Sequence, residues 1–300
     1  MERILPTSDL GFKKVLASEE NKDILAGLIE DFFEIKAEDI VIEKPYSIAV
    51  CKEFIETEEI TKLRQTLKDV AASFRVADFV SEVQIKKTLF YEERALYYPF
   101  ERFVQNYSKV EAIKIGSDGK PMRYSSLRPI YAFNILGYTL FEDDSDALRI
   151  FELYDPKRNK RFKELLRIGF FELEKNNIET VNQQHWRDYF KTGEAGPEAP
   201  AYIKKASKII EYVNLSEEER NVISTLERIE ANEQAEREYL IIESKAKGKA
   251  EGKTEGKIEI AKNAIKRKMA FEDISAITGF SIADLQELKE KIDKEGQPNF

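Results

Sequence analysis

Lys68-Asp69-Val70-Ala71 is followed, thirteen residues after its aspartate, by Glu82-Val83-Gln84, and these two stretches indicate the fold and its chemistry. Residues 66–72 and 79–85 are both strand candidates, and the second has the alternation of a strand. Successive side chains of a strand point to opposite faces, so Glu82 and Gln84 share one face. The two segments can therefore place two carboxylates and an amide around one metal ion.

Oxygen ligands of this kind suit a hard cation such as Mg²⁺, which keeps several of its waters. We expect Asp69 and Glu82 to be metal ligands, with the backbone carbonyl of Val83 as another. An amide cannot act as a general base near neutral pH, so we expect Gln84 to orient the attacking water. Such an ion activates water and neutralises charge on a phosphoryl oxygen. The sequence thus predicts a catalytic trio of Asp69, Glu82 and Gln84.

The rest of the composition offers little other chemistry. The chain has 300 residues, one histidine and one cysteine. The lone His185 gives no support for acyl transfer, and Cys51 has no partner for an internal disulfide. No stretch approaches the roughly 18–20 apolar residues of a membrane span, and the N-terminus lacks a secretory signal pattern. These observations predict a cytoplasmic protein without a membrane segment.

Charge is distributed unevenly along the chain. The net charge of −8 argues weakly against a generic nucleic-acid binder. Residues 211–243 carry ten acidic and three basic side chains, whereas residues 245–268 carry nine basic and three acidic ones. A solvated helix explains such runs, and so does a basic segment that touches phosphate or pairs with the acidic segment of another chain. The second explanation predicts a homo-oligomer formed through this arm.

Strand and helix patterns alternate over the first two thirds of the chain, which favours a mixed α/β core. Residues 7–36 and 90–107 are predicted to be helical, 39–56 extended or looped, and 127–141 a buried central strand. Asp78 is expected in the turn between the two catalytic strands. We predict a nuclease-like domain over residues 1–215, a charged helical arm with a glycine repeat over 216–268, and a small helical hairpin over 269–300.

Several motifs, in order, resemble one known family. These are Leu5-Pro6-Thr7-Ser8-Asp9-Leu10-Gly11-Phe12-Lys13-Lys14, the two catalytic stretches, Glu93-Arg94-Ala95-Leu96-Tyr97-Tyr98, Phe171-Glu172-Leu173-Glu174-Lys175 and Ile274-Ser275-Ala276-Ile277-Thr278-Gly279. The chain resembles the Rpn family of recombination-promoting nucleases, also described as PD-(D/E)XK nuclease family transposases. In that family glutamine commonly replaces the lysine of the motif. Its hairpin usually carries an Asp-Gly turn, whereas residues 73–78 contain no glycine, which leaves the register of Asp69 against Glu82 open.

The resemblance implies a restriction-endonuclease-like core, a mixed sheet flanked by helices, that cleaves DNA with Mg²⁺. Asp9 would then add an acidic group near the metal, or serve only as a charge at a helix start. Lys86 and Lys87 would meet the phosphate backbone. Arg94 and Tyr98 would contact the substrate, or belong to a helix that only packs on the sheet. The alternative function is a catalytically decayed relative that acts as a DNA-binding or oligomerising regulatory protein.

Overall fold

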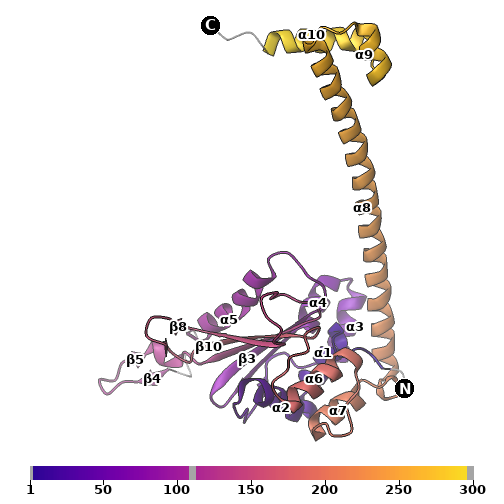
Figure 1. Ribbon diagram of the computed structural model, residues 1–300. Coiled ribbons are helices and arrows are strands. Elements are labelled where there is room, and N and C mark those ends of the chain that lie inside the picture. Colours follow the sequence, from indigo (N-terminus) through magenta and orange to yellow (C-terminus); the bar gives the residue numbers. More distant parts are fainter. Residues whose placement is uncertain (1–2, 108–112, 296–300) are drawn as a thin grey trace. The chain divides into compact units, whose positions relative to one another are not determined.

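The computed structural model describes residues 3–107 and 113–295, and its contacts divide the chain into two compact units, Met1–Ser224 and Thr225–Phe300. The first unit is an α/β domain with a six-stranded mixed sheet and helices on both faces (Figure 1). This confirms the predicted fold class. The predicted three-part division of the chain stays a prediction, and residues 1–2, 108–112 and 296–300 of its segments lie outside the described residues.

The main sheet has the strand order β1-β2-β3-β6-β10-β7. Strand β6 lies parallel to β3 and β10, and the other neighbours are antiparallel. The strands are β1 (Val41–Ile42), β2 (Asp69–Phe74), β3 (Ala77–Gln84), β6 (Ile130–Leu136), β7 (Leu148–Glu152) and β10 (Leu166–Glu172). Two small hairpins are formed by β4 (Lys114–Ile115) with β5 (Pro121–Met122), and by β8 (Tyr154–Asp155) with β9 (Lys160–Arg161).

The helices of the first unit are α1 (Asp9–Leu16), α2 (Lys22–Phe33), α3 (Ile48–Glu56), α4 (Ile60–Lys68), α5 (Tyr91–Tyr107), α6 (Val181–Thr192) and α7 (Ala201–Ile209). Aromatic rings at the end of α2 pack on one face of the sheet, with Phe32 4.4 Å from Phe133 between ring centroids. Helix α5 covers the other face, where its buried Tyr91 and Ala95 join a cluster that includes Ala132. The sheet is therefore enclosed on both sides.

The glycine-free hairpin between β2 and β3 is regular. Its strands pair from Phe74 opposite Ala77 down to Asp69 opposite Glu82. The two turn residues, Arg75 and Val76, are not among the described residues with a positive φ, so the turn does not need glycine. Arg128 donates hydrogen bonds to the carbonyls of Phe74 and Ala77 on either side of it. These contacts fix the register that the sequence left open.

Three local predictions were wrong. Asp78 lies within β3, not in the turn, and is fully buried. Residues 48–56 form a helix, because Ser47 caps it and Cys51 turns into the core, although the run of β-branched residues favours an extended chain. The helical region 7–36 is interrupted by a short 3₁₀ turn at Glu19–Asn21.

Helix α8 (Glu217–Lys266) begins in the first unit and supplies most of the second, as the charged pattern predicted. Its first turn is closed by a capping box, in which Ser216 and Glu219 accept each other's backbone N–H groups. The hairpin of α9 (Phe271–Thr278) and α10 (Ile282–Glu295) was also predicted, with Gly279 at a φ of 78° and Ser281 as the cap. Within the described residues, no helix is long and apolar enough to cross a membrane.

Candidate active site

Asp69 and Glu82 occupy directly opposed positions on the antiparallel strands β2 and β3. The side chains of such a pair start roughly 4.5–5.5 Å apart at Cβ. Both residues line one cavity of about 660 Å³, and residues of α5, including Ala95 and Tyr98, line it as well. The structure therefore brings the two predicted ligands together on the α5 face of the sheet.

Gln84 lies two residues beyond Glu82 in β3, and Arg94 of α5 binds both side chains. One guanidinium nitrogen, Nη2, donates to Glu82 Oε1 and to Gln84 Oε1, each at 2.6 Å. The amide nitrogen of Gln84 donates to the carbonyl of Lys86 at 2.6 Å. The Arg94 guanidinium also lies 5.1 Å from the centre of the Tyr91 ring. Arg94 thus places a positive charge directly beside the predicted catalytic carboxylate and amide.

Lys13 of α1 is a site residue that sequence reasoning missed. Only 2% of the residue is exposed, it lines the cavity, and its ammonium donates to the backbone carbonyl of Asp69 at 2.7 Å. Burial lowers the pKa of Lys13 to about 8, against the opposing effect of the Asp69 carboxylate. The sequence pattern of the two strands gives no sign of Lys13, because this lysine lies on a helix more than fifty residues before them.

A second unforeseen group is a chain of ion pairs along the cavity wall. Arg102 of α5 binds both carboxylate oxygens of Glu43, one through Nη1 at 2.5 Å. Its Nε lies 3.5 Å from the carboxylate of the fully buried Asp78, which also accepts a hydrogen bond from Asn106 at 2.6 Å. Arg128 approaches the same aspartate to 3.8 Å. These contacts fasten α5, and with it Arg94 and Tyr98, to the β2–β3 hairpin.

Asn134 lines the cavity, and Tyr91 supports it from α5. Asn134 of β6 is in register with Glu82, and its side chain accepts a hydrogen bond from the Tyr91 hydroxyl at 3.1 Å. Its own amide donates to the carbonyl of Gly169 on β10. Tyr98 is only partly buried, and burial together with the carboxylates of Asp69 and Glu82 raises its pKa. Tyr98 keeps its proton at neutral pH and can donate a hydrogen bond into the cavity.

The other predicted residues lie further from this centre. Lys86 and Lys87 follow β3 and are exposed, and neither lines the cavity. Asp9 lies in the first turn of α1, one turn from Lys13, and is not a lining residue either. Val83 is buried, and strand alternation directs its side chain to the face opposite Glu82. The Val83 carbonyl stays a predicted ligand.

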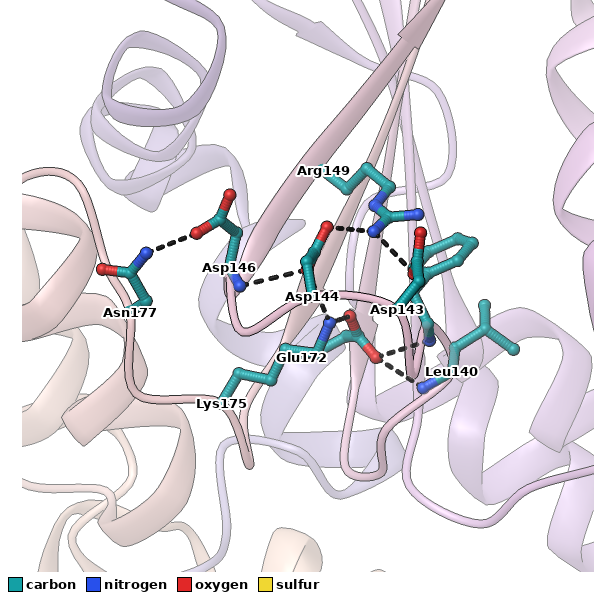
Figure 2. Close-up of polar contacts among 9 residues, drawn as sticks. Leu140, Asp143, Asp144, Asp146, Arg149, Glu172, Lys175 and Asn177 are labelled. Carbon is teal, nitrogen blue, oxygen red and sulfur yellow. Dashed lines mark hydrogen bonds and ion pairs between the residues drawn. The ribbon is translucent and has the colours of Figure 1, made fainter.

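A further polar cluster lies at the same end of the sheet. Glu172, at the end of β10, accepts the backbone N–H group of Leu140 at 2.5 Å (Figure 2). It also accepts the backbone N–H group of Phe141 at 3.1 Å. Lys175 pairs with Glu172 at 2.7 Å and with Asp144 at 3.1 Å. Glu172 and Gln84 are both in register with Leu136, so this cluster holds the loop after β6 beside the site.

The fold and the site together define the class. In the mixed sheet, the β2–β3 hairpin carries two directly opposed acidic residues, and helix α5 covers that face of the sheet. The family model of PD-(D/E)XK nuclease family transposases matches residues 6–239. The chain belongs to this family. No curated protein and no solved structure matches it.

The donor set fits a divalent metal ion of the kind that PD-(D/E)XK nucleases generally use. Two opposed carboxylates that line one cavity can hold an ion that keeps several waters. Among the described residues, no group of three or more histidine, cysteine, aspartate or glutamate side chains is arranged to hold a metal. Two carboxylates alone would leave most coordination positions of such an ion to water and substrate.

Proposed function

We propose that this protein is a Mg²⁺-dependent DNA endonuclease associated with recombination or a mobile element. The observation that carries the proposal is the direct pairing of Asp69 with Glu82 at the wall of one cavity. Family membership supports a role related to nuclease or transposase chemistry. The absence of a membrane-spanning helix from the described residues is compatible with the cytoplasmic location that we propose.

Each side chain has a distinct role in this proposal. Asp69 and Glu82 hold the ion, with the Val83 carbonyl as a further ligand. When bound, such an ion lowers the pKa of water and neutralises charge on a phosphoryl oxygen. Gln84 orients the attacking water. Lys86 and Lys87 contact the phosphate backbone as the strand leaves the site.

Two cations act in place of the motif's lysine, which is glutamine at position 84. Lys13 binds the backbone carbonyl of Asp69, and Arg94 binds the Glu82 carboxylate. Preorganised positive charge stabilises the charge that develops on a phosphoryl group in the transition state. The Tyr98 hydroxyl donates a hydrogen bond to a substrate oxygen. Asp9 lies one turn of helix from Lys13 and outside the cavity lining.

Plasmid cleavage tests the proposal directly. The purified protein is incubated with supercoiled plasmid and Mg²⁺, beside Asp69→Ala, Glu82→Ala and the control Asp39→Ala, whose aspartate is exposed. We expect cleavage by the wild type and the control, and loss of cleavage in both site variants and in EDTA. Cleavage that persists in both site variants would rule out this site. An inactive but folded wild-type protein would favour the decayed, regulatory relative.

We also propose that the protein self-associates through α8. The helix exposes four consecutive apolar residues, Tyr239, Leu240, Ile241 and Ile242, each more than half exposed. A side chain added at Gly248, Gly252 or Gly256 would meet open space. Acidic and basic halves of two antiparallel copies would attract one another. Light scattering of the full chain, and of a variant with Leu240→Glu and Ile241→Glu, tests this, and a wild-type monomer would contradict it.

A further inference from the structure

The hairpin over residues 153–164, built on β8 and β9, is a positively charged part of the first unit outside the site. It carries five basic residues and two acidic ones, in a chain whose net charge is −8. Every residue from Pro156 to Glu164 is exposed. The site described above uses none of them.

The turn of this hairpin is built to hold its shape. The Asp155 carboxylate accepts the backbone N–H groups of Lys157 at 3.0 Å and Arg158 at 3.4 Å. The same carboxylate pairs with the Arg158 guanidinium at 2.8 Å. Asn159 takes a left-handed φ of 51°, which asparagine tolerates well. These contacts hold the backbone of the turn in one conformation and so fix the positions from which its side chains project.

The two arginines of the hairpin form ion pairs, whereas three of its lysines form none with any residue that the structure describes. Arg158 is balanced by Asp155, and Arg161 lies 2.6 Å from Glu152. Within the part of the chain that the structure describes, Lys157, Lys160 and Lys163 form no ion pair. Three uncompensated ammonium groups within seven residues are suited to an anionic polymer whose charges repeat along its length.

Aromatic rings accompany the lysines. Phe162 is 78% exposed and Tyr154 is 48% exposed. Phe162 extends the small ladder by donating its N–H to the carbonyl of Leu153 at 3.0 Å, so its side chain shares a face with Lys160. A phenylalanine ring this exposed gains little from the fold, whereas a ring beside an ammonium group can stack on a base while the lysine meets the phosphate.

We propose that this hairpin binds an unpaired stretch of DNA that continues from the cleavage site. The proposal rests on the nuclease function above. The hairpin begins directly after Glu152, the last residue of β7. Glu152 pairs with Arg167 of β10, which lies three residues from Phe170, the β10 residue in register with Glu82. Glu152 and Glu82 are therefore three residues and three strands apart in the sheet, or roughly 17 Å at about 3.3 Å per residue and 4.8 Å per strand. A few nucleotides cover that distance.

Fluorescence anisotropy with a labelled single-stranded oligonucleotide in EDTA tests this on the full chain, because binding without metal does not depend on cleavage. The variant carries Lys157→Ala, Lys160→Ala and Lys163→Ala. The matched control removes three other exposed lysines, with Lys36→Ala, Lys204→Ala and Lys208→Ala. The hairpin variant should bind at least about tenfold more weakly, with a salt slope reduced by about 2 for three single-strand phosphate contacts. Equal affinities of the two triple variants would overturn the proposal.

Phe162→Ala separates stacking from simple attraction. Loss of one stacked base weakens binding roughly 5- to 150-fold, so we expect this variant to lose affinity for the single strand and to keep it for a blunt duplex. Equal loss on both DNAs would contradict the unpaired strand. Vesicles of phosphatidylserine and phosphatidylcholine provide the other arm, and a hairpin variant that loses vesicle binding but not DNA binding would identify a membrane contact instead. Inactivity in the plasmid assay alone would reject the nuclease and leave these binding results standing.

Discussion

Asp69 stands opposite Glu82 across the β2–β3 hairpin, and the two share one cavity. If both carboxylates hold one ion, their effects on metal affinity are not independent. We expect Asp69→Asn and Glu82→Gln each to weaken Mn²⁺ binding at least about tenfold, and the double variant to be little worse than either, because coupled residues are non-additive. Isothermal titration measures this. Strictly additive losses would indicate two separate sites.

Lys13→Met is expected to separate stability from activity. Methionine has a similar volume but carries no charge. The ammonium that it replaces is costly to bury, since burial lowers the pKa of Lys13 to about 8. We expect little net change in thermal stability at pH 7, because relief of the buried charge offsets loss of the hydrogen bond to the Asp69 carbonyl. Cleavage should fall roughly 10²-fold through loss of transition-state charge stabilisation. Lys36→Met, at an exposed position, is the control. Full activity in Lys13→Met would remove this lysine from the catalytic group.

Arg94→Gln should change metal binding and cleavage in opposite directions. The guanidinium shares an oxygen of Glu82, so its removal leaves that carboxylate more available to a cation. We expect Mn²⁺ affinity to rise several-fold and the maximal cleavage rate to fall. Titration calorimetry and a single-turnover assay on one preparation measure the two effects. A parallel loss of both would mean that Arg94 only supports the shape of Glu82.

Glu219 gives a pH dependence of stability with a definite sign. Burial alone would raise the pKa of this carboxyl, but hydrogen bonds from Lys14, the Ser216 N–H and Tyr46 lower it below the usual 4.5. Its stabilising effect is therefore complete above about pH 4.5 and is lost as the pH falls through the lowered value. The stability gap between wild type and Glu219→Gln should be widest near pH 7 and close in acid. Urea unfolding at several pH values measures it, and a constant gap would contradict the assignment.

Asp78→Ala is expected to be strongly destabilising. The fully buried carboxylate faces Arg102 and Arg128 and accepts the Asn106 hydrogen bond. Removal of one partner from a buried ionic group costs about 3–5 kcal/mol, and Glu43 offsets part of that by retaining Arg102. We expect a loss of about 2–4 kcal/mol in urea unfolding, against little change for Glu198→Ala, whose side chain is exposed. A loss below about 1 kcal/mol would show that the network is dispensable.

Periodicity and local motifs were sufficient to predict strands β2 and β3, the face shared by Glu82 and Gln84, and the capped hairpin of α9 and α10. They failed where tertiary contacts decide. Asp78 looks like a turn residue until two arginines and Asn106 are seen to enclose it. Lys13 and Glu43 are separated in sequence from the catalytic strands, and only the packing of α1 and β1 brings them to the cavity.

The neighbouring lysines of α1 have different partners. Lys13 holds the carbonyl of Asp69, where the catalytic hairpin begins, while Lys14 pairs with Glu219 in the first turn of α8. Only one peptide bond separates these two attachments. A change in the orientation of the first turn of α8 would therefore act on α1, the eight-residue helix that also holds the start of β2. Helix α1 thus connects the first turn of α8 to the strand that carries Asp69, a proposed metal ligand.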